Sequence, residues 1–316
     1  MNAQGPTEPL AVEVERSGVV ESVHLVDVAV CDDAGRRVAS AGNAGAVAYL
    51  RSSAKPVQAA VCLDAGWSPG DDRQIAIACA SHNGEPPHLE AVRSILHDAG
   101  LGEESLRCPP ARPLVPSSVE PAPVYHNCSG KHAAMLATNR AKGWSLDDYR
   151  DPDHPLQRSI AGRVAVLAGT PPDAVGIDGC GVPTFAMSLS SAATLFARLP
   201  AEAPRVADAM LADPFLVGGT DRLCTALMDA TGTVVLKIGA EGIACAAIPE
   251  ERIGVALKTR DGTQRGRDVA VIGILELLGV LSEPVAPALA PFAHPSVLGG
   301  GVSVGSVRWR GTLRRG

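Results

Sequence analysis

The chain of 316 residues has few aromatic side chains, since Phe, Trp and Tyr together make up only 3% of it. Few aromatic rings leave few platforms on which nucleic-acid bases could stack. Basic residues are not gathered into a patch or arm either, apart from the short tail RWRGTLRRG at 308–316, and the net charge is −6. These deficits together argue against a nucleic-acid partner.

Long apolar runs are missing as well. No run reaches the roughly 18 to 20 residues that a membrane span needs, and the polar start MNAQGPTEPLAVEVERSG lacks the apolar core of a secretory signal. We therefore expect a cytoplasmic protein without a membrane partner. Its eight cysteines are scattered singly along the chain, which argues against a disulfide scaffold.

Strand patterns lie at both ends of the chain, with helical patterns between them. Residues 12–42 alternate apolar and polar side chains and predict a hairpin that turns at DDAG, 32–35. Three further strand patterns lie at 233–240, 242–249 and 252–259, before a helical pattern at 268–281. This order predicts an α+β fold in which one antiparallel sheet, packed with helices, unites the N- and C-terminal segments.

We expect a single domain over residues 13–316, preceded by a flexible tail at 1–12. A helical part, at about 65–225, is inserted between the sheet-forming ends. Its predicted helices lie at 87–100, 129–143, 155–168, 184–197 and 203–212, and the Pro-rich segment 106–124 is predicted to be irregular.

The stretch YLRSSAKPVQAA places Ser52 three residues before Lys55, where an apolar run becomes a helix. That spacing puts both side chains on one helical face. A lysine kept neutral by burial could accept the serine proton, because burial disfavours the charged amine. Penicillin-binding proteins and β-lactamases use the same S-x-x-K pattern. The alternative is a helix-capping serine beside an exposed lysine.

A dyad of this kind needs a second hydroxyl or base and a distant lysine to handle protons. Ser81 lies in the polar stretch ASHNGE after an apolar segment, and Lys237 lies in the strand pattern KIGAEG. A strand lysine followed by glycine is typical of a place where substrate approaches the backbone. The alternatives are a serine in an ordinary turn and an exposed charge on an edge strand.

Two further stretches, HNCSGKH and GIDGCGVP, carry candidate ligands. Cys128, Lys131 and His132 lie at the start of a predicted helix, and Asp178 and Cys180 lie in a Gly-rich loop. Spacing alone allows a zinc half-site at Cys128 with Cys180 as a distant partner. The positive helix N-terminus would favour both a thiolate and a neutral lysine. A reactive or buried cysteine and an ordinary turn are the alternatives.

These motifs, taken together, resemble the L-asparaginase II family of thermolabile, rhizobial-type asparaginases. The resemblance follows the family's order over nearly the whole chain: VESVH (20–24), RSSAKPVQA (51–59), ASHNGEPPHLEAVR (80–93), NCSGKHAAMLA (127–137), DPDHPLQ (151–157), GIDGCGVPTFAMSL (176–189), KIGAEG (237–242) and ALKTRDGTQR (256–265). It implies a fold similar to serine β-lactamases and glutaminases, hydrolysis of L-asparagine to L-aspartate and ammonia, and a homodimer.

The resemblance also implies roles for individual residues. Ser52 and Lys55 match the family's Ser-Lys pair, and Ser81 matches a second serine that works with a distant lysine, either Lys237 or its rival Lys258. The remaining positions fall into two groups. A zinc site completed by water is implied at Cys128, Lys131 and Cys180, and support of the substrate or the metal at Arg51, His132 and Asp178.

Two departures from the family pattern concern the rim of the pocket. VESVHLV stands where many relatives have VESVHRG, and CPPARP stands where many have a C-G-P-H stretch. We expect these changes to alter the affinity for the substrate more than the catalytic reaction. Other functions stay open: a glutaminase, a β-lactam-type acyl hydrolase using the same dyad, or a catalytically silent relative that binds zinc or an amino acid.

Overall fold

The computed structural model describes residues 7–282 and 284–316. The chain divides into two compact units. The sheet unit comprises the segment that ends at Ser53 together with Met187–Arg198 and Leu236–Gly316, and the helical unit comprises Ala54–Ala186 and Leu199–Val235. Of the expected tail, residues 1–6 lie outside the described residues, and the first strand already begins at Leu10.

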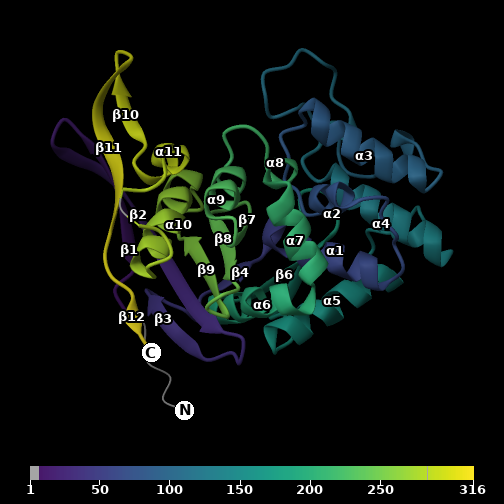
Figure 1. Ribbon diagram of the computed structural model, residues 1–316, viewed down its shortest axis with the longest axis horizontal. Coiled ribbons are helices and arrows are strands. Elements are labelled where there is room, and N and C mark those ends of the chain that lie inside the picture. Colours follow the sequence, from purple (N-terminus) through teal and green to yellow (C-terminus); the bar gives the residue numbers. More distant parts are fainter. Residues whose placement is uncertain (1–6, 283) are drawn as a thin grey trace. The chain divides into compact units, whose positions relative to one another are not determined.

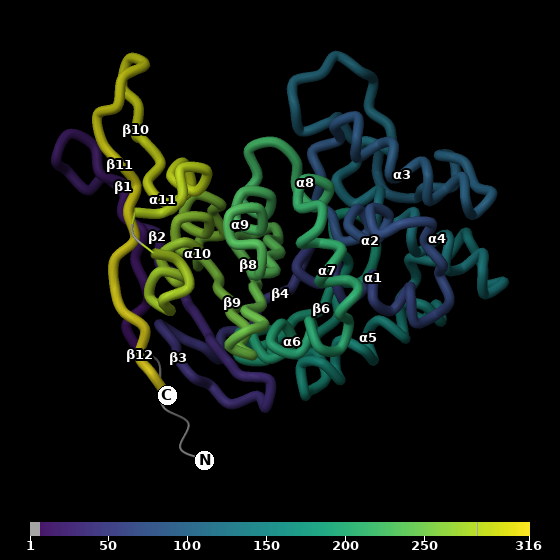
Figure 2. The backbone as a smooth tube through the Cα atoms, viewed as in Figure 1, coloured from purple at the N-terminus to yellow at the C-terminus, as the bar shows by residue number. Residues whose placement is uncertain are grey.

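The sheet unit is built on an antiparallel sheet of nine strands within the described residues. Its order is β10-β11-β1-β2-β9-β8-β7, with β3 paired to β2 and β12 paired to β3. Strands β1 and β11, from opposite ends of the chain, run side by side (Figures 1 and 2), which confirms the predicted α+β fold. The strands are β1 (Leu10–Arg16), β2 (Val19–Asp32), β3 (Arg37–Ala41), β7 (Val235–Ile238), β8 (Ile243–Ile248), β9 (Ile253–Thr259), β10 (Ser296–Gly299), β11 (Val302–Arg310) and β12 (Arg314–Arg315).

The N-terminal segment is a three-stranded meander, where the sequence predicted one hairpin. The turn at DDAG is present and joins β2 to β3, with Gly35 at a φ of 81°. A second turn at Ser17 and Gly18, with φ of 50° and 82°, separates β1 from β2. Two consecutive residues at positive φ match the right-handed twist of paired strands, so this Ser-Gly pair also closes a hairpin.

Helices cover this sheet. α10 (Gln264–Leu277) packs on β9, β2 and β11, and the first part of α6 (Leu189–Glu202) packs on β9, where Gly254 lies against the Ala193 carbonyl. All six residues of β8 are buried. A strand buried on both faces needs a covering layer on each side, which the helices supply.

The helical unit contains most of the helices (Figure 1). The helix predicted over 184–197 was wrong at its start: Pro183–Ser188 forms strand β6, paired to β5 (Ala174–Ile177), and α6 begins only at Leu189. The helices of this unit are α1 (Lys55–Asp64), α2 (Asp72–Ala78), α3 (Pro86–Asp98), α4 (Ser129–Lys142), α5 (Pro155–Ala168), α7 (Pro204–Ala212), α8 (Pro214–Val217) and α9 (Leu223–Thr231). Within the described residues, no helix combines the length and the apolar character that crossing a membrane requires.

Helices α2 and α4 approach closely at Gly130, and this position gives a test of the packing. A Cβ there would overlap the Ile77 carbonyl. We expect Gly130→Ala to lower the free energy of unfolding by about 1–3 kcal/mol, because a well-packed interior resists added volume. Gly162→Ala in α5 is the matched control, since a Cβ there meets nothing within 4 Å, and it should stabilise the helix slightly. Urea unfolding of both variants checks this, and equal behaviour would contradict the close approach.

Candidate active site

The turn that contains Ser52 belongs to the sheet unit and is fixed there by contacts of its neighbouring residues. Strand β4 (Val47–Tyr49) leads into the 3₁₀ turn η1 (Arg51–Ala54), and Arg51 adopts a φ of +49° although it has a side chain. The Ser53 hydroxyl donates to the Lys237 carbonyl at 2.8 Å. Backbone in the left-handed region costs about 1–3 kcal/mol for such a residue and persists where its surroundings fix it, most often at functional sites.

Strand β7 ends beside this turn. A Cβ on Gly239 would lie 3.0 Å from the Leu50 carbonyl oxygen and 3.3 Å from Cβ of Arg51. Two amides of these touching segments, those of Ser52 and Ala240, donate to no acceptor among the described residues. Unpaired N–H groups on two adjoining segments are suited to binding a negatively charged oxygen.

The two candidate strand lysines differ in burial. Lys237 in β7 is completely buried, and its Nζ donates to the Ile238 carbonyl at 3.0 Å. Lys258 in β9 is only partly buried, and its Nζ donates to the Thr259 carbonyl at 2.5 Å. Burial lowers the pKa of Lys258, while the charge of Glu241 opposes that shift.

Lys55 is the first residue of α1 and is completely buried in the helical unit. Its Nζ contacts the Ala80 carbonyl, the Ser81 hydroxyl at 3.0 Å and the Asn127 carbonyl at 3.3 Å. Burial lowers the pKa of Lys55, and the charge of Lys131 lowers it further, although the thiol of Cys128 works against the shift.

If Lys55 is neutral, its three contacts determine where its two hydrogens and its lone pair point. A neutral amine has two N–H donors and one lone pair, and carbonyl oxygens can only accept. With its two hydrogens directed to Ala80 and Asn127, the lone pair is left for the proton of Ser81. The arrangement thus joins Lys55 to Ser81. The half-buried hydroxyl of Ser52, by contrast, forms no hydrogen bond with a described residue.

The predicted zinc ligands gather in the helical unit, although Cys180 is far along the chain from the other two. Nζ of Lys131 donates to Sγ of Cys180 at 3.1 Å, and Cys128 shares a hydrogen bond with Cys180. All three side chains are buried. The hydrogen bond from Cys128 and the charge of Lys131 hold the pKa of Cys180 far below its usual range. The same contact, together with burial, raises the pKa of Cys128 well above its ordinary value.

His132 borders this thiol cluster. The Tyr149 hydroxyl accepts from the Arg107 amide at 3.1 Å and shares a hydrogen bond of 2.6 Å with Nδ1 of His132. The other ring nitrogen, Nε2, is buried and has no hydrogen-bond partner among the described residues. Burial lowers the pKa of His132, and the neighbouring Cys180 opposes this shift only in part.

Asp178 lies in the tight loop before Cys180, where its Oδ1 accepts from the Gly179 amide at 2.8 Å and its charge acts on Lys131. Two residues of this unit that contact the predicted site residues were not identified from the sequence. Asn127 supplies a carbonyl for Lys55, and its Oδ1 lies 3.0 Å from Sγ of Cys128 as an alternative acceptor to Cys180; Tyr149 fixes the His132 ring. Asn127 lies inside the HNCSGKH motif, whereas nothing in the spacing of Tyr149 indicated its role.

The donor set can be compared with the requirements of zinc. Among residues 7–282 and 284–316, no three His, Cys, Asp or Glu side chains are placed to hold a metal ion. The predicted set instead combines two thiols with an amine. These are sulfur and nitrogen donors, which zinc prefers, and the unpartnered Nε2 of His132 adds a polar atom beside them. The three side chains therefore supply donor atoms of the type that zinc prefers. Lys131 must lose its proton to bind the ion, because a charged amine has no free lone pair.

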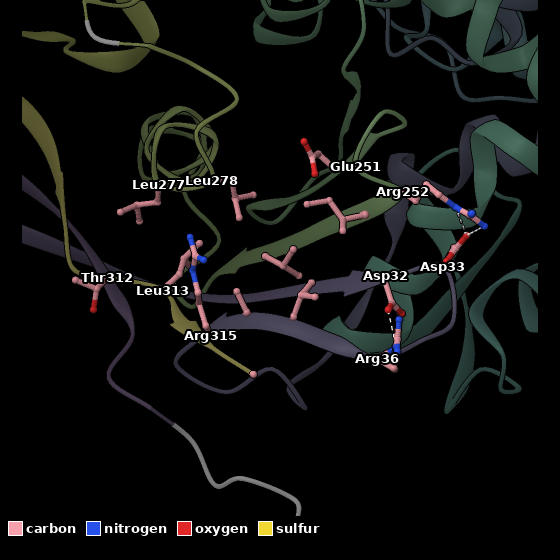
Figure 3. Close-up of a pocket in the computed structure, with 15 residues that line it drawn as sticks. Asp32, Asp33, Arg36, Glu251, Arg252, Leu277, Leu278, Thr312, Leu313 and Arg315 are labelled. Atoms are coloured by element: carbon pink, nitrogen blue, oxygen red, sulfur yellow. Dashed lines mark hydrogen bonds and ion pairs between the residues drawn. The ribbon is translucent and has the colours of Figure 1, made fainter.

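A groove of about 760 Å³ lies elsewhere in the sheet unit (Figure 3). Its lining includes Leu277 and Leu278 at the end of α10, and Arg315 near the C-terminus. None of the predicted site residues lines it. The groove therefore has no part in the chemistry considered below.

Residues 12–309 match the sequence family described as L-asparaginase II. The chain belongs to the L-asparaginase II family. The match spans nearly the whole sequence and confirms the resemblance found in the motifs. Membership of the L-asparaginase II family supports an amidohydrolase activity.

Comparison with solved structures finds weaker likenesses. A crystal structure of a protein named Mglu is 14% identical, with a TM-score of 0.48 over 81% of this chain and 67% of that one. Mglu in its glutamate form gives the same identity and TM-score, with 61% of that chain covered. A β-lactamase from Mycobacterium bovis is 17% identical, with a TM-score of 0.37 over 81% of this chain and 94% of that one. The chain thus spans about three fifths to two thirds of the Mglu chains. No curated protein sequence matches it.

Proposed function

We propose that this L-asparaginase II family member hydrolyses L-asparagine to L-aspartate and ammonia through an acyl-enzyme on Ser52. The observation that carries the proposal is the completely buried amine of Lys55, which lies 3.0 Å from the hydroxyl of Ser81 and follows Ser52 by three residues. A lysine with a lowered pKa, in contact with a hydroxyl, is equipped for proton transfer. Family membership supports the amide as the bond that is cleaved.

In the first step, the Ser52 oxygen attacks the side-chain carbonyl of asparagine while neutral Lys55 accepts the serine proton. Ser52 precedes Lys55 by one helical turn of chain. The negative oxygen of the tetrahedral intermediate accepts hydrogen bonds from the free amides of Ser52 and Ala240. One such donor is typically worth about 3 to 4 kcal/mol.

In the second step, the carbon–nitrogen bond breaks and the leaving nitrogen takes up a proton. Ser81 carries this proton, because its hydroxyl is hydrogen-bonded to Lys55. Lys237 assists Ser81 in this proton transfer. Ammonia then departs, and a water molecule attacks the ester on Ser52 while Ser81 and Lys55 accept a proton from that water. This proton passes to the Ser52 oxygen as the ester C–O bond breaks, so that L-aspartate and the free serine are released.

We further propose that Cys128, Lys131 and Cys180 hold a zinc ion. When bound, the ion supplies a positive charge that attracts the carboxylate of the substrate. Arg51 and Asp178 orient the charged ends of the substrate, and His132 supports Cys180. The homodimer stays a prediction.

The proposal is tested by measuring ammonia release from asparagine and from glutamine with the same preparation. We expect asparagine to be the better substrate by kcat/KM. A preference for glutamine would make the chain a glutaminase, and turnover of a chromogenic β-lactam alone would make it a β-lactam hydrolase. Binding of an amino acid in a calorimetric titration, with no turnover of any of these compounds, would identify a silent relative.

The zinc proposal predicts that Cys128→Ala and Cys180→Ala lose bound metal and bind substrate more weakly, because each removes a thiol donor. Cys62→Ala is the matched control, since Cys62 is equally buried but contacts Thr138, and it should retain its metal. Elemental analysis of the purified proteins measures this. Freshly purified wild-type protein that contains no zinc and is fully active would remove the metal site.

A further inference from the structure

We propose that Arg267 is a positioning residue of the sheet unit, which orients the Ala240 amide toward the reacting carbonyl oxygen. This inference rests on the proposed function, in which that amide stabilises the intermediate. Arg267 lies in the first turn of α10, and only 2% of it is exposed. Its Nη1 donates to the Gly239 carbonyl at 2.8 Å.

The contact fixes the direction of the next amide. The Gly239 amide already donates to the Ile243 carbonyl of β8 at 2.8 Å, so both polar groups of Gly239 are held. A peptide unit is planar and trans, so its C=O and N–H point in opposite directions. With the Gly239 carbonyl turned to Arg267, the Ala240 N–H points away from it, and this N–H has no acceptor among the described residues.

Among the described residues, the Gly239 carbonyl has no other hydrogen-bond donor. The loop passes through Glu241 at a φ of 59° and Gly242 at a φ of 68° before β8 begins. Residue 239 is glycine, which permits many backbone conformations. Without the guanidinium, the peptide between Gly239 and Ala240 could rotate and turn its N–H away from the substrate.

The buried charge of Arg267 is not favoured by the helix that carries it. A cation in the first turn of a helix opposes the positive helix end. Removing a guanidinium from water is costly unless its hydrogen bonds replace the lost hydration. Among the described residues, the other side-chain hydrogen bonds of Arg267 are to Asp268 at 2.7 Å and to Gln264 at 3.4 Å, both on its own helix. The Gly239 carbonyl is the contact that reaches the loop after β7.

The test compares Arg267→Met with Arg265→Met, a matched control on the same helix whose arginine contacts His24 rather than Gly239. We expect Arg267→Met to lower kcat about 10- to 100-fold, because a misdirected catalytic group costs up to roughly that factor. KM for asparagine and inhibition by L-aspartate should stay within about twofold, since the ground state does not use the amide. Arg265→Met should behave as wild type.

Two additional measurements separate positioning from a structural role. An aldehyde analogue of asparagine, which forms a tetrahedral adduct with serine, should bind Arg267→Met more weakly by the factor lost in kcat/KM. Arg267→Lys retains a donor and should recover part of kcat, and it replaces the Met variant if that variant does not fold. Unchanged kcat in a folded variant, or a loss confined to KM, would overturn the proposal. Failure of the proposed function itself would appear separately, as absent turnover in the wild type.

Discussion

Ser52→Ala is expected to reduce kcat/KM for asparagine by about 10⁴-fold or more while the protein stays folded. Removing the nucleophile of a serine hydrolase eliminates the covalent route and leaves only residual catalysis by the remaining groups. The Ser52 hydroxyl makes no hydrogen bond with a described residue, so its loss leaves no buried partner unsatisfied. Ammonia release and thermal unfolding, measured on one preparation, test both halves of this expectation.

Ser53→Ala is the matched control. Ser53 is completely buried and donates to the Lys237 carbonyl, so its replacement should lower the free energy of unfolding by about 1 kcal/mol and retain most of the turnover. Near-normal turnover in Ser52→Ala would refute the assignment. If Ser81→Ala were the inactive variant instead, the nucleophile would be Ser81, whose hydroxyl contacts Lys55.

Lys55→Met is expected to lower kcat/KM about 10³- to 10⁴-fold without a comparable loss of stability. The substitution removes the base, and general bases typically contribute about 10²- to 10⁴-fold. Methionine fills a similar space but leaves the Ala80 and Asn127 carbonyls without this donor, so the free energy of unfolding should fall by only about 1–3 kcal/mol. Lys142→Met, at an exposed site in the last turn of α4, should leave turnover unchanged. Retained turnover in Lys55→Met would exclude it as the base.

The lowered pKa of Lys55 also predicts two pH effects. Catalysis requires the neutral amine, so kcat/KM should fall as the pH drops through the pKa of the folded protein. Between that value and the higher pKa of the unfolded chain, only the unfolded chain binds a proton at Lys55, so this residue makes the wild type less stable as the pH falls. The stability of Lys55→Met relative to wild type should therefore increase as the pH is lowered across this window. A constant difference would contradict the shift.

Local patterns predicted those parts of the fold whose residues determine their own conformation. The helix over 129–143 ends as predicted at Gly143, which adopts a φ of 67°, because glycine tolerates this conformation better than other residues. The segment Pro183–Ser188 was misread because it carries no clear strand alternation. It is a strand because β5 pairs with it, and a pairing partner cannot be inferred from the segment alone.

The sequence could indicate the chemistry of the site but not most of its contacts. The motifs supplied the residue types, and the structure places Lys131 beside Cys180 and Lys55 beside Ser81. The Lys55 contacts with main-chain carbonyls were not predictable, because every residue has a carbonyl and packing alone decides where it points. The contact between Arg267 and the Gly239 carbonyl was not predictable for the same reason, because it joins two segments of the sheet unit that are separate in the sequence.

The most direct test of the account is to locate the acyl group. Wild-type protein is mixed with asparagine, quenched in acid within the turnover time, digested and mapped by mass spectrometry. We predict an aspartyl ester on the peptide that contains Ser52, absent from Ser52→Ala and enriched when Ser81→Ala slows the later steps. An ester on Ser81 with Ser52 unmodified would contradict the assignment of the nucleophile.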